Sequence, residues 1–191
     1  MAISLKKDQS IALNDVETGL TTVALGLGWG TKKTGGLLSS LFGGSSEGPI
    51  DLDASCIVFD LQGKQIDVIW FRKLRSADGT IVHTGDDRVG GGKRVNETIL
   101  VQLDKLKPTA HRLVFTVNSY TGEKFNKLAR ATAQLANHVT GEVLLEYDLT
   151  SFGPYTGLVM CDLTRSAAGW VFKALGIQAQ GSTYLSLNSS L

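Results

Sequence analysis

Short segments rich in β-branched and aromatic residues recur along this chain, and turn-favouring dipeptides that contain glycine separate them. This pattern constrains the fold more than any other feature, because such segments prefer the pleated, half-buried surface of a β-sheet. Glycine occurs 22 times and proline only 3 times, which favours many tight turns over long helices. Regularly spaced short strands of this kind predict an all-β fold, a β-sandwich. The segments are 20–29, 54–59, 65–71, 98–103, 112–120, 142–149, 158–163 and 170–175, and the turns are Gln62-Gly63, Asp78-Gly79, Thr121-Gly122, Thr140-Gly141 and Ala168-Gly169.

One segment, 125–138, carries two patterns that conflict. Its stretch 128–136, Leu-Ala-Arg-Ala-Thr-Ala-Gln-Leu-Ala, is helical by propensity. Read with a period of two residues, the same stretch has an apolar face opposite a polar one, so a strand that enters the turn at Thr140-Gly141 also fits. The apolar face consists of Ala129, Ala131, Ala133 and Leu135, and the polar face consists of Arg130, Thr132 and Gln134.

The chain length of 191 residues fits one domain or at most two small ones, and is sufficient to bury a core without disulfides. Segment 30–48 is low in complexity and rich in glycine and serine, which predicts a flexible loop inserted into the domain. Within it, the apolar stretch Leu-Leu-Ser-Ser-Leu-Phe at 37–42 is expected to contact a partner, a membrane surface or its own domain.

The charge balance argues against a nucleic-acid function. Nineteen Lys and Arg stand against 18 Asp and Glu, so the formal net charge is +1. The basic residues are scattered in pairs, without a basic run that has aromatic residues interleaved. Neither DNA nor an anionic membrane is therefore expected to be held by the field of the whole protein.

The cysteines and the N-terminal sequence point to a reducing compartment. Cys56 and Cys161 each lie in an apolar run, which predicts buried, reduced thiols rather than a disulfide framework. The three histidines leave no zinc-binding spacing. The N-terminus has no signal-peptide core, and there is no apolar run of about 18 residues. We therefore expect a cytoplasmic protein.

Three acidic groupings are candidates for binding a metal. They are Asp51-Leu52-Asp53, the stretch His83-Thr84-Gly85-Asp86-Asp87, and Asn96-Glu97. Calcium takes six to eight oxygen ligands from carboxylates, amides and carbonyls, so loops of this composition suit calcium better than zinc. An EF-hand is excluded, because Ala54-Ser55-Cys56 follows Asp53 where that loop requires oxygen ligands and a glycine. A carboxylate that only caps a turn is the alternative for any single Asp here.

Motifs for nucleotide binding and hydrolysis are incomplete. Gly26-Leu27-Gly28-Trp29-Gly30 lacks the third glycine of a dinucleotide-binding fingerprint. Gly90-Gly91-Gly92-Lys93-Arg94 lacks the ending of a Walker A motif, although a backbone nest for an anion is conceivable there. There is no GxSxG, and nothing identifies a catalytic base among the histidines. We therefore nominate no catalytic nucleophile.

Several phrases, taken in order along the chain, resemble the TerD family of tellurium-resistance and stress-response proteins. They are Gly26-Leu27-Gly28-Trp29, Ile50-Asp51-Leu52-Asp53-Ala54-Ser55, His83-Thr84-Gly85-Asp86-Asp87 and Trp170-Val171-Phe172-Lys173-Ala174-Leu175-Gly176. The segment between Trp29 and Asp51 resembles that of the TerZ-like members most. The likeness runs from Ile3 to about Gly176, nearly the whole chain.

The resemblance implies a β-sandwich of two antiparallel sheets, formed by residues 1–191 as a single domain, with calcium bound in loops at one end. It also implies a role in resistance to tellurite and other stresses, no catalysed reaction, and a strand rather than a helix over most of 128–138. The metal ligands that it implies are Asp51, Asp53, Asp86, Asp87, Asn96 and Glu97.

The chain departs from the family pattern in the glycine-rich stretch after the histidine. Where the family carries further acids, this chain has Gly91, Lys93, Val95 and Asn96. The resemblance therefore implies a weakened calcium site. The alternative is an interaction subunit that works without a metal and assembles with related Ter proteins, or at the membrane surface.

Overall fold

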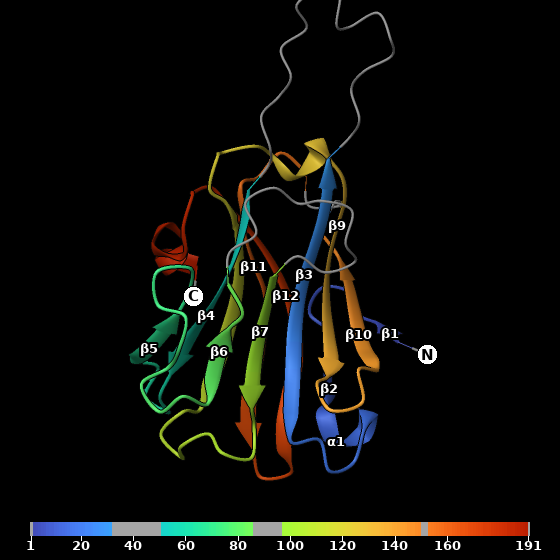
Figure 1. Ribbon diagram of the computed structural model, residues 1–191, viewed down its shortest axis with the longest axis vertical. Coiled ribbons are helices and arrows are strands. Elements are labelled where there is room, and N and C mark those ends of the chain that lie inside the picture. Colours follow the sequence, from blue (N-terminus) through green and yellow to red (C-terminus); the bar gives the residue numbers. More distant parts are fainter. Residues whose placement is uncertain (1, 32–50, 86–96, 150–152, 191) are drawn as a thin grey trace, which may run out of the picture.

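The computed structural model of the protein describes residues 2–31, 51–85, 97–149 and 153–190. In these ranges the strands form two six-stranded sheets that pack face to face (Figure 1). Sheet A consists, in spatial order, of β1 (Ile3–Ser4), β10 (Val143–Asp148), β9 (Leu128–Asn137), β3 (Thr22–Thr31), β7 (Glu97–Gln102) and β6 (Ile81–His83). Sheet B consists of β2 (Ser10–Ala12), β12 (Gly169–Ala179), β11 (Gly157–Ser166), β8 (Arg112–Ser119), β4 (Leu52–Phe59) and β5 (Gln65–Ile69). The predicted β-sandwich is confirmed.

The helices described are short. They are α1 (Leu13–Val16) and the 3-10 turns η1 (Phe125–Lys127) and η3 (Tyr184–Ser190). Among the described residues, none of these helices has the length and apolar character needed to cross a membrane.

The strand directions follow the prediction except at one edge. The described strand pairs are antiparallel, apart from β1, whose Ile3 and Ser4 pair in parallel with β10. The predicted sandwich of two antiparallel sheets is thus confirmed, and this two-residue pair at the edge of sheet A is a local addition to it. A hairpin forces an antiparallel pair, whereas β1 and β10 are joined through most of the sandwich, and a long connection permits either direction.

The core lies between the two sheets and explains the alternation along the strands. In β7, Glu97, Ile99 and Val101 are buried and the residues between them are not, so one face of the strand points inward. Trp29 and Phe115 are fully buried in the same core. In β4 both faces are buried. The outer face of sheet B is covered in part by η3, which contacts β8, β11 and β12. Leu187 of η3 packs there in a second apolar cluster with Val114, Val159 and Leu175.

Segment 128–137 is the strand β9, as the family resemblance implied and against local helix propensity. Ala131, Ala133 and Leu135 face the core, as expected from the period of two residues. Ala129, which was assigned to the same apolar face, is exposed, because the pairing with β3 shifts register between Gly30 and Thr31. A shift of one residue moves a side chain to the other face of a strand.

The predicted turns and cysteines are confirmed, whereas the predicted loop is not described. Each of the five predicted turn glycines has a positive φ: Gly63 77°, Gly79 75°, Gly122 87°, Gly141 74° and Gly169 112°. Cys56 and Cys161 are buried free thiols. The predicted flexible loop at 30–48 lies outside the described residues, except for Gly30 and Thr31, which end β3.

Candidate metal site

Three of the acidic residues predicted as metal ligands lie where β4 and β7 begin, at one end of the sandwich. This end is at the top of Figure 1, beside the ends of β3 and β6. Asp51, Asp53 and Glu97 are described there and all three are buried. Asp86, Asp87 and Asn96 lie outside the described residues, so their predicted role stays a prediction.

Glu97 is held by the backbone of the opposite sheet. Its Oε2 accepts a hydrogen bond of 2.8 Å from the Ala54 N–H. The strand β5 pairs with β4 only from Cys56 onward, so β5 offers no hydrogen-bond partner to the Ala54 N–H. The carboxylate of Glu97 therefore bridges sheet A and sheet B at an open edge of β4. This contact also satisfies a buried N–H group, which would otherwise be costly.

His83, at the end of β6, lies against the same carboxylate. Its Nε2 is 3.5 Å from Glu97 Oε2, and neither side chain has any exposed surface. The Gly85 N–H donates a hydrogen bond of 3.1 Å to His83 Nδ1. In the neutral imidazole the proton is then on Nε2, which makes no hydrogen bond among the described residues. Sequence reasoning missed this role, because no short motif brings the two residues together; the register of β6 and β7, which pairs His83 with Ile99, does so.

Asp51 and Asp53 approach this end from a different direction. Leu52 and Ala54 face the core, so strand alternation places Asp53 on the outer face of sheet B, where it is in register with Asn118 of β8. Asp51 is anchored through its backbone, since its carbonyl accepts a hydrogen bond of 2.9 Å from the Tyr120 N–H. Asp51 and Asp53 are 8% and 4% exposed.

The chemistry of these donors fits a hard cation. Within the described part of the chain, Glu97 Oε1 is buried without a hydrogen-bond partner. Carboxylate oxygens are the ligands that calcium prefers. The described residues do not by themselves provide a cluster of three or more His, Cys, Asp or Glu side chains placed to hold a metal. A complete calcium coordination shell therefore requires oxygen atoms from outside the described residues.

The comparisons with known proteins agree with the motifs. The model of the TerD domain matches residues 1–185. The chain is 41% identical to the tellurium resistance protein TerZ of Serratia marcescens, over 99% of this chain and 96% of that protein. It is 36% identical to the stress response protein SCP2 of Bacillus subtilis (strain 168), over 92% of each.

A solved structure shares the fold. The crystal structure of a homologue of the telluride resistance protein TerD from Streptomyces coelicolor A3(2) matches with a TM-score of 0.71 and 23% identity, over 87% of this chain and 95% of that one. Together with the match over residues 1–185 and the likeness to TerZ, this confirms the resemblance read from the sequence. The chain belongs to the TerD family.

Proposed function

We propose that the chain is a non-enzymatic stress-response protein that takes part in tellurium resistance and binds calcium weakly. The site is the end of the sandwich where β4 and β7 begin, and Glu97 is the ligand that faces the space between the sheets. The other ligands that the sequence predicts are Asp51, Asp53, Asp86, Asp87 and Asn96, of which Asp53 lies on the outer face of sheet B. The names of the relatives, tellurium resistance protein and stress response protein, support the cellular role. A bound calcium ion would supply positive charge that holds the two sheets together at this end.

The observation that supports calcium most strongly is the environment of Glu97. The side chain has no exposed surface, and its Oε2 accepts a hydrogen bond from the Ala54 N–H. Within the described residues Oε1 has none. Burying an ionised carboxylate costs several kcal/mol unless a counter-charge or further donors compensate. His83 donates no hydrogen bond to Oε1 within the described residues, whereas a cation bound at Oε1 would supply a counter-charge.

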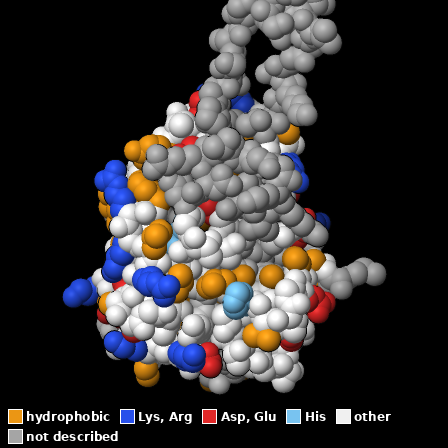
Figure 2. Space-filling view, viewed as in Figure 1, with side chains coloured by type: hydrophobic (Ala, Val, Ile, Leu, Met, Phe, Trp, Pro, Cys, Tyr) orange, Lys and Arg blue, Asp and Glu red, His pale blue; other side chains and the backbone are white. Residues whose placement is uncertain are grey.

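The second candidate is a subunit that works without a metal and assembles with other Ter-type proteins. A partly exposed row of aromatic rings favours it. Edge-to-face contacts join Tyr184 to Trp70, Trp70 to Phe71 and Phe71 to Tyr120. Tyr184 is buried and Trp70 and Phe71 are half-buried, and the Arg72 guanidinium lies 5.4 and 5.2 Å from the Trp70 and Phe71 rings. Tyr120 is 46% exposed. Figure 2 shows hydrophobic side chains beside Lys and Arg on the left flank of the molecule. Aromatic residues and arginine are enriched in protein interfaces.

Calorimetric titration with calcium separates the two candidates. Glu97→Gln keeps the shape of the side chain and removes the charge, and Glu142→Gln makes the same change at an exposed position. If calcium binds at Glu97, the native protein and Glu142→Gln bind it alike and Glu97→Gln loses at least about tenfold in affinity. A folded native protein that binds no calcium, but restores tellurite resistance to a deletion strain, would favour the metal-free subunit.

A further inference from the structure

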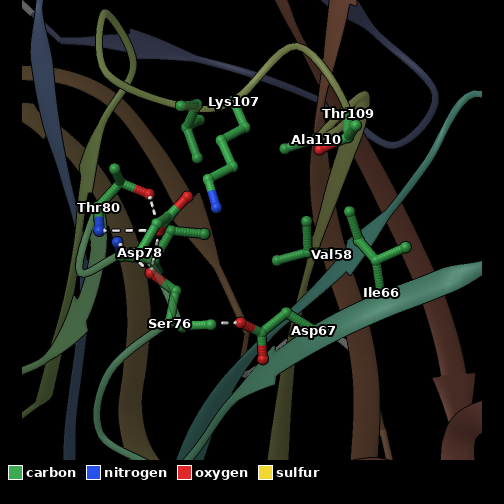
Figure 3. A pocket seen from close by; sticks show the side chains of 12 residues that line it. Val58, Ile66, Asp67, Ser76, Asp78, Thr80, Lys107, Thr109 and Ala110 are labelled. Atoms are coloured by element: carbon green, nitrogen blue, oxygen red, sulfur yellow. Dashed lines mark hydrogen bonds between the residues drawn. The ribbon is translucent and has the colours of Figure 1, made fainter.

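A second site is suggested by a pocket at the opposite end of the sandwich from Glu97. Its volume is about 160 Å³. It lies between the segment that joins β5 to β6 and the segment that joins β7 to β8 (Figure 3). An engineered cavity of about 150 Å³ holds one benzene molecule, so this pocket suits a ligand of similar size. It shares no residue with the proposed calcium ligands.

One side of the pocket carries a fixed carboxylate, Asp78. Its Oδ1 accepts three hydrogen bonds, of 2.7 Å from Ser76 Oγ, 2.6 Å from Thr80 Oγ1 and 3.1 Å from the Thr80 N–H. Partial burial raises the pKa of Asp78, but the hydrogen bonds from Thr80 and Ser76 outweigh it, so the pKa lies below its ordinary value. The side chain is therefore ionised and oriented before any ligand arrives. Its second oxygen accepts no hydrogen bond from the described residues.

A cation faces this carboxylate from the other segment. In Figure 3 the Lys107 side chain reaches toward Asp78, and its charge is close enough to lower the pKa of that carboxyl. Among the described residues the Lys107 ammonium makes no hydrogen bond or ion pair, although the backbone carbonyl of this residue accepts a hydrogen bond of 2.9 Å from the Ala110 N–H. The other acid in the lining, Asp67, already has a counter-ion, because the Lys73 ammonium contacts it and the Val68 and Ala77 N–H groups donate to it.

The opposite side of the pocket is apolar. Val58 and Ile66 lie across from Asp78 in Figure 3, with Ala110 above them. One carboxylate and one ammonium thus remain available beside a short aliphatic wall. A ligand that carries only one charge would be repelled by the group of the same sign, whereas a zwitterion would satisfy both.

We propose that this pocket binds a free α-amino acid with a short aliphatic side chain. Its carboxylate pairs with the Lys107 ammonium, its ammonium group pairs with the second oxygen of Asp78, and its side chain packs on Val58, Ile66 and Ala110. Pre-formed hydrogen bonds at Asp78 reduce the ordering that binding requires. This role is independent of calcium, since the two ends of the sandwich share no described ligand.

Binding of L-valine, measured by saturation-transfer NMR on the full chain, tests the proposal. Isobutylamine lacks the carboxylate of valine, and 3-methylbutanoate lacks its amine. We expect L-valine to bind and each analogue to bind at least about tenfold more weakly. Absence of valine binding, or equal binding of the three compounds, would overturn the proposal.

A matched pair of lysine variants adds a second readout. Lys107 and Lys105 are both exposed in the segment between β7 and β8, but only Lys107 lines the pocket. Lys107→Gln should lower the affinity for L-valine about tenfold. The affinity for isobutylamine should not fall, because that amine has no partner at residue 107. Lys105→Gln should change neither. Equal effects of the two variants on L-valine would contradict a specific contact at Lys107.

Discussion

Glu97 combines two properties that a surface carboxylate does not have. It is 1% exposed, and it bonds to the backbone of the opposite sheet through the Ala54 N–H. Family motifs predicted Glu97 as a ligand, but neither the contact with Ala54 nor that with His83 was predictable. Both depend on which residues the register of the strands places side by side, and a single sequence does not specify register between strands that are distant in the chain.

At the same scale, the two thiols are expected to be inert in the native protein. Burial raises the pKa of both Cys56 and Cys161, with a further contribution from nearby Asp67 at Cys56 and from Asp162 at Cys161. Because the thiolate is the reactive form, alkylation by iodoacetamide requires opening of the fold. We expect the rate of labelling to be at least about a hundredfold lower in buffer than in urea. Mass spectrometry measures the two rates. Comparable rates in the two conditions would show that a thiol is accessible.

Among the elements, β9 shows most clearly where local sequence and fold disagree. Residues 128–136 favour a helix by propensity, yet the segment is a strand between β3 and β10. Pairing on both sides supplies backbone hydrogen bonds, and a period of two residues buries Ala131, Ala133 and Leu135. Tertiary pairing therefore outweighs the helix propensity of alanine. The longer strands were predictable from composition, whereas β1, β2 and β6, of two or three residues each, are too short to show a pattern.

A substitution in β9 separates strand from helix preference. Ala136 is partly exposed and lies in register with Ala24 on one side and Val143 on the other. Ala136→Val should stabilise the protein by up to about 1 kcal/mol, since a β-branched residue packs well between neighbouring strands. Urea unfolding measures the change. A loss of about 0.5 kcal/mol, as expected for valine in a helix, would contradict the strand.

The turn between β9 and β10 offers a measurement of backbone strain alone. Gly141 has a φ of +74°, and an added Cβ would meet nothing within 4 Å. Gly141→Ala should therefore cost about 1 kcal/mol from the left-handed backbone, and Gly141→Asn should cost less, because asparagine tolerates that region. Thermal unfolding of the two variants compares them. An alanine variant as stable as the native protein would mean that the turn has another conformation.

For the whole molecule, the two ends of the sandwich differ in chemistry. One end gathers the buried acids Asp51, Asp53 and Glu97, and the other holds the pocket with Asp78 and Lys107. The formal net charge of +1 provides no overall attraction for a cation, so any calcium affinity must come from local ligands. The sandwich and the family were predictable from ordered motifs. The ligand geometry was not, because it depends on contacts between segments far apart in sequence.

Calcium should stabilise the whole protein only at high concentration. With a dissociation constant of ~10⁻⁴ M, micromolar calcium leaves the site nearly empty, whereas about 1 mM calcium adds roughly 1.4 kcal/mol. For a chain of this size that corresponds to a rise of about 3–6 °C in Tm. Differential scanning calorimetry with calcium, and with magnesium as a control, measures it. A full shift already in micromolar calcium would mean that the site is not weakened.

The most direct test is calcium calorimetry on the native protein and on a Lys93→Asp, Asn96→Asp double variant, with Lys105→Asp as a control at the other end. Removing a cation at an assumed ~6 Å from the metal recovers roughly 1.4 kcal/mol even at a dielectric constant of about 80, which is about tenfold in affinity. We predict a native dissociation constant of ~10⁻⁴ M or weaker, at least about tenfold tighter binding by the double variant, and no change in the control. Submicromolar native binding, or a double variant no tighter than the native protein, would contradict a calcium site weakened by Lys93 and Asn96.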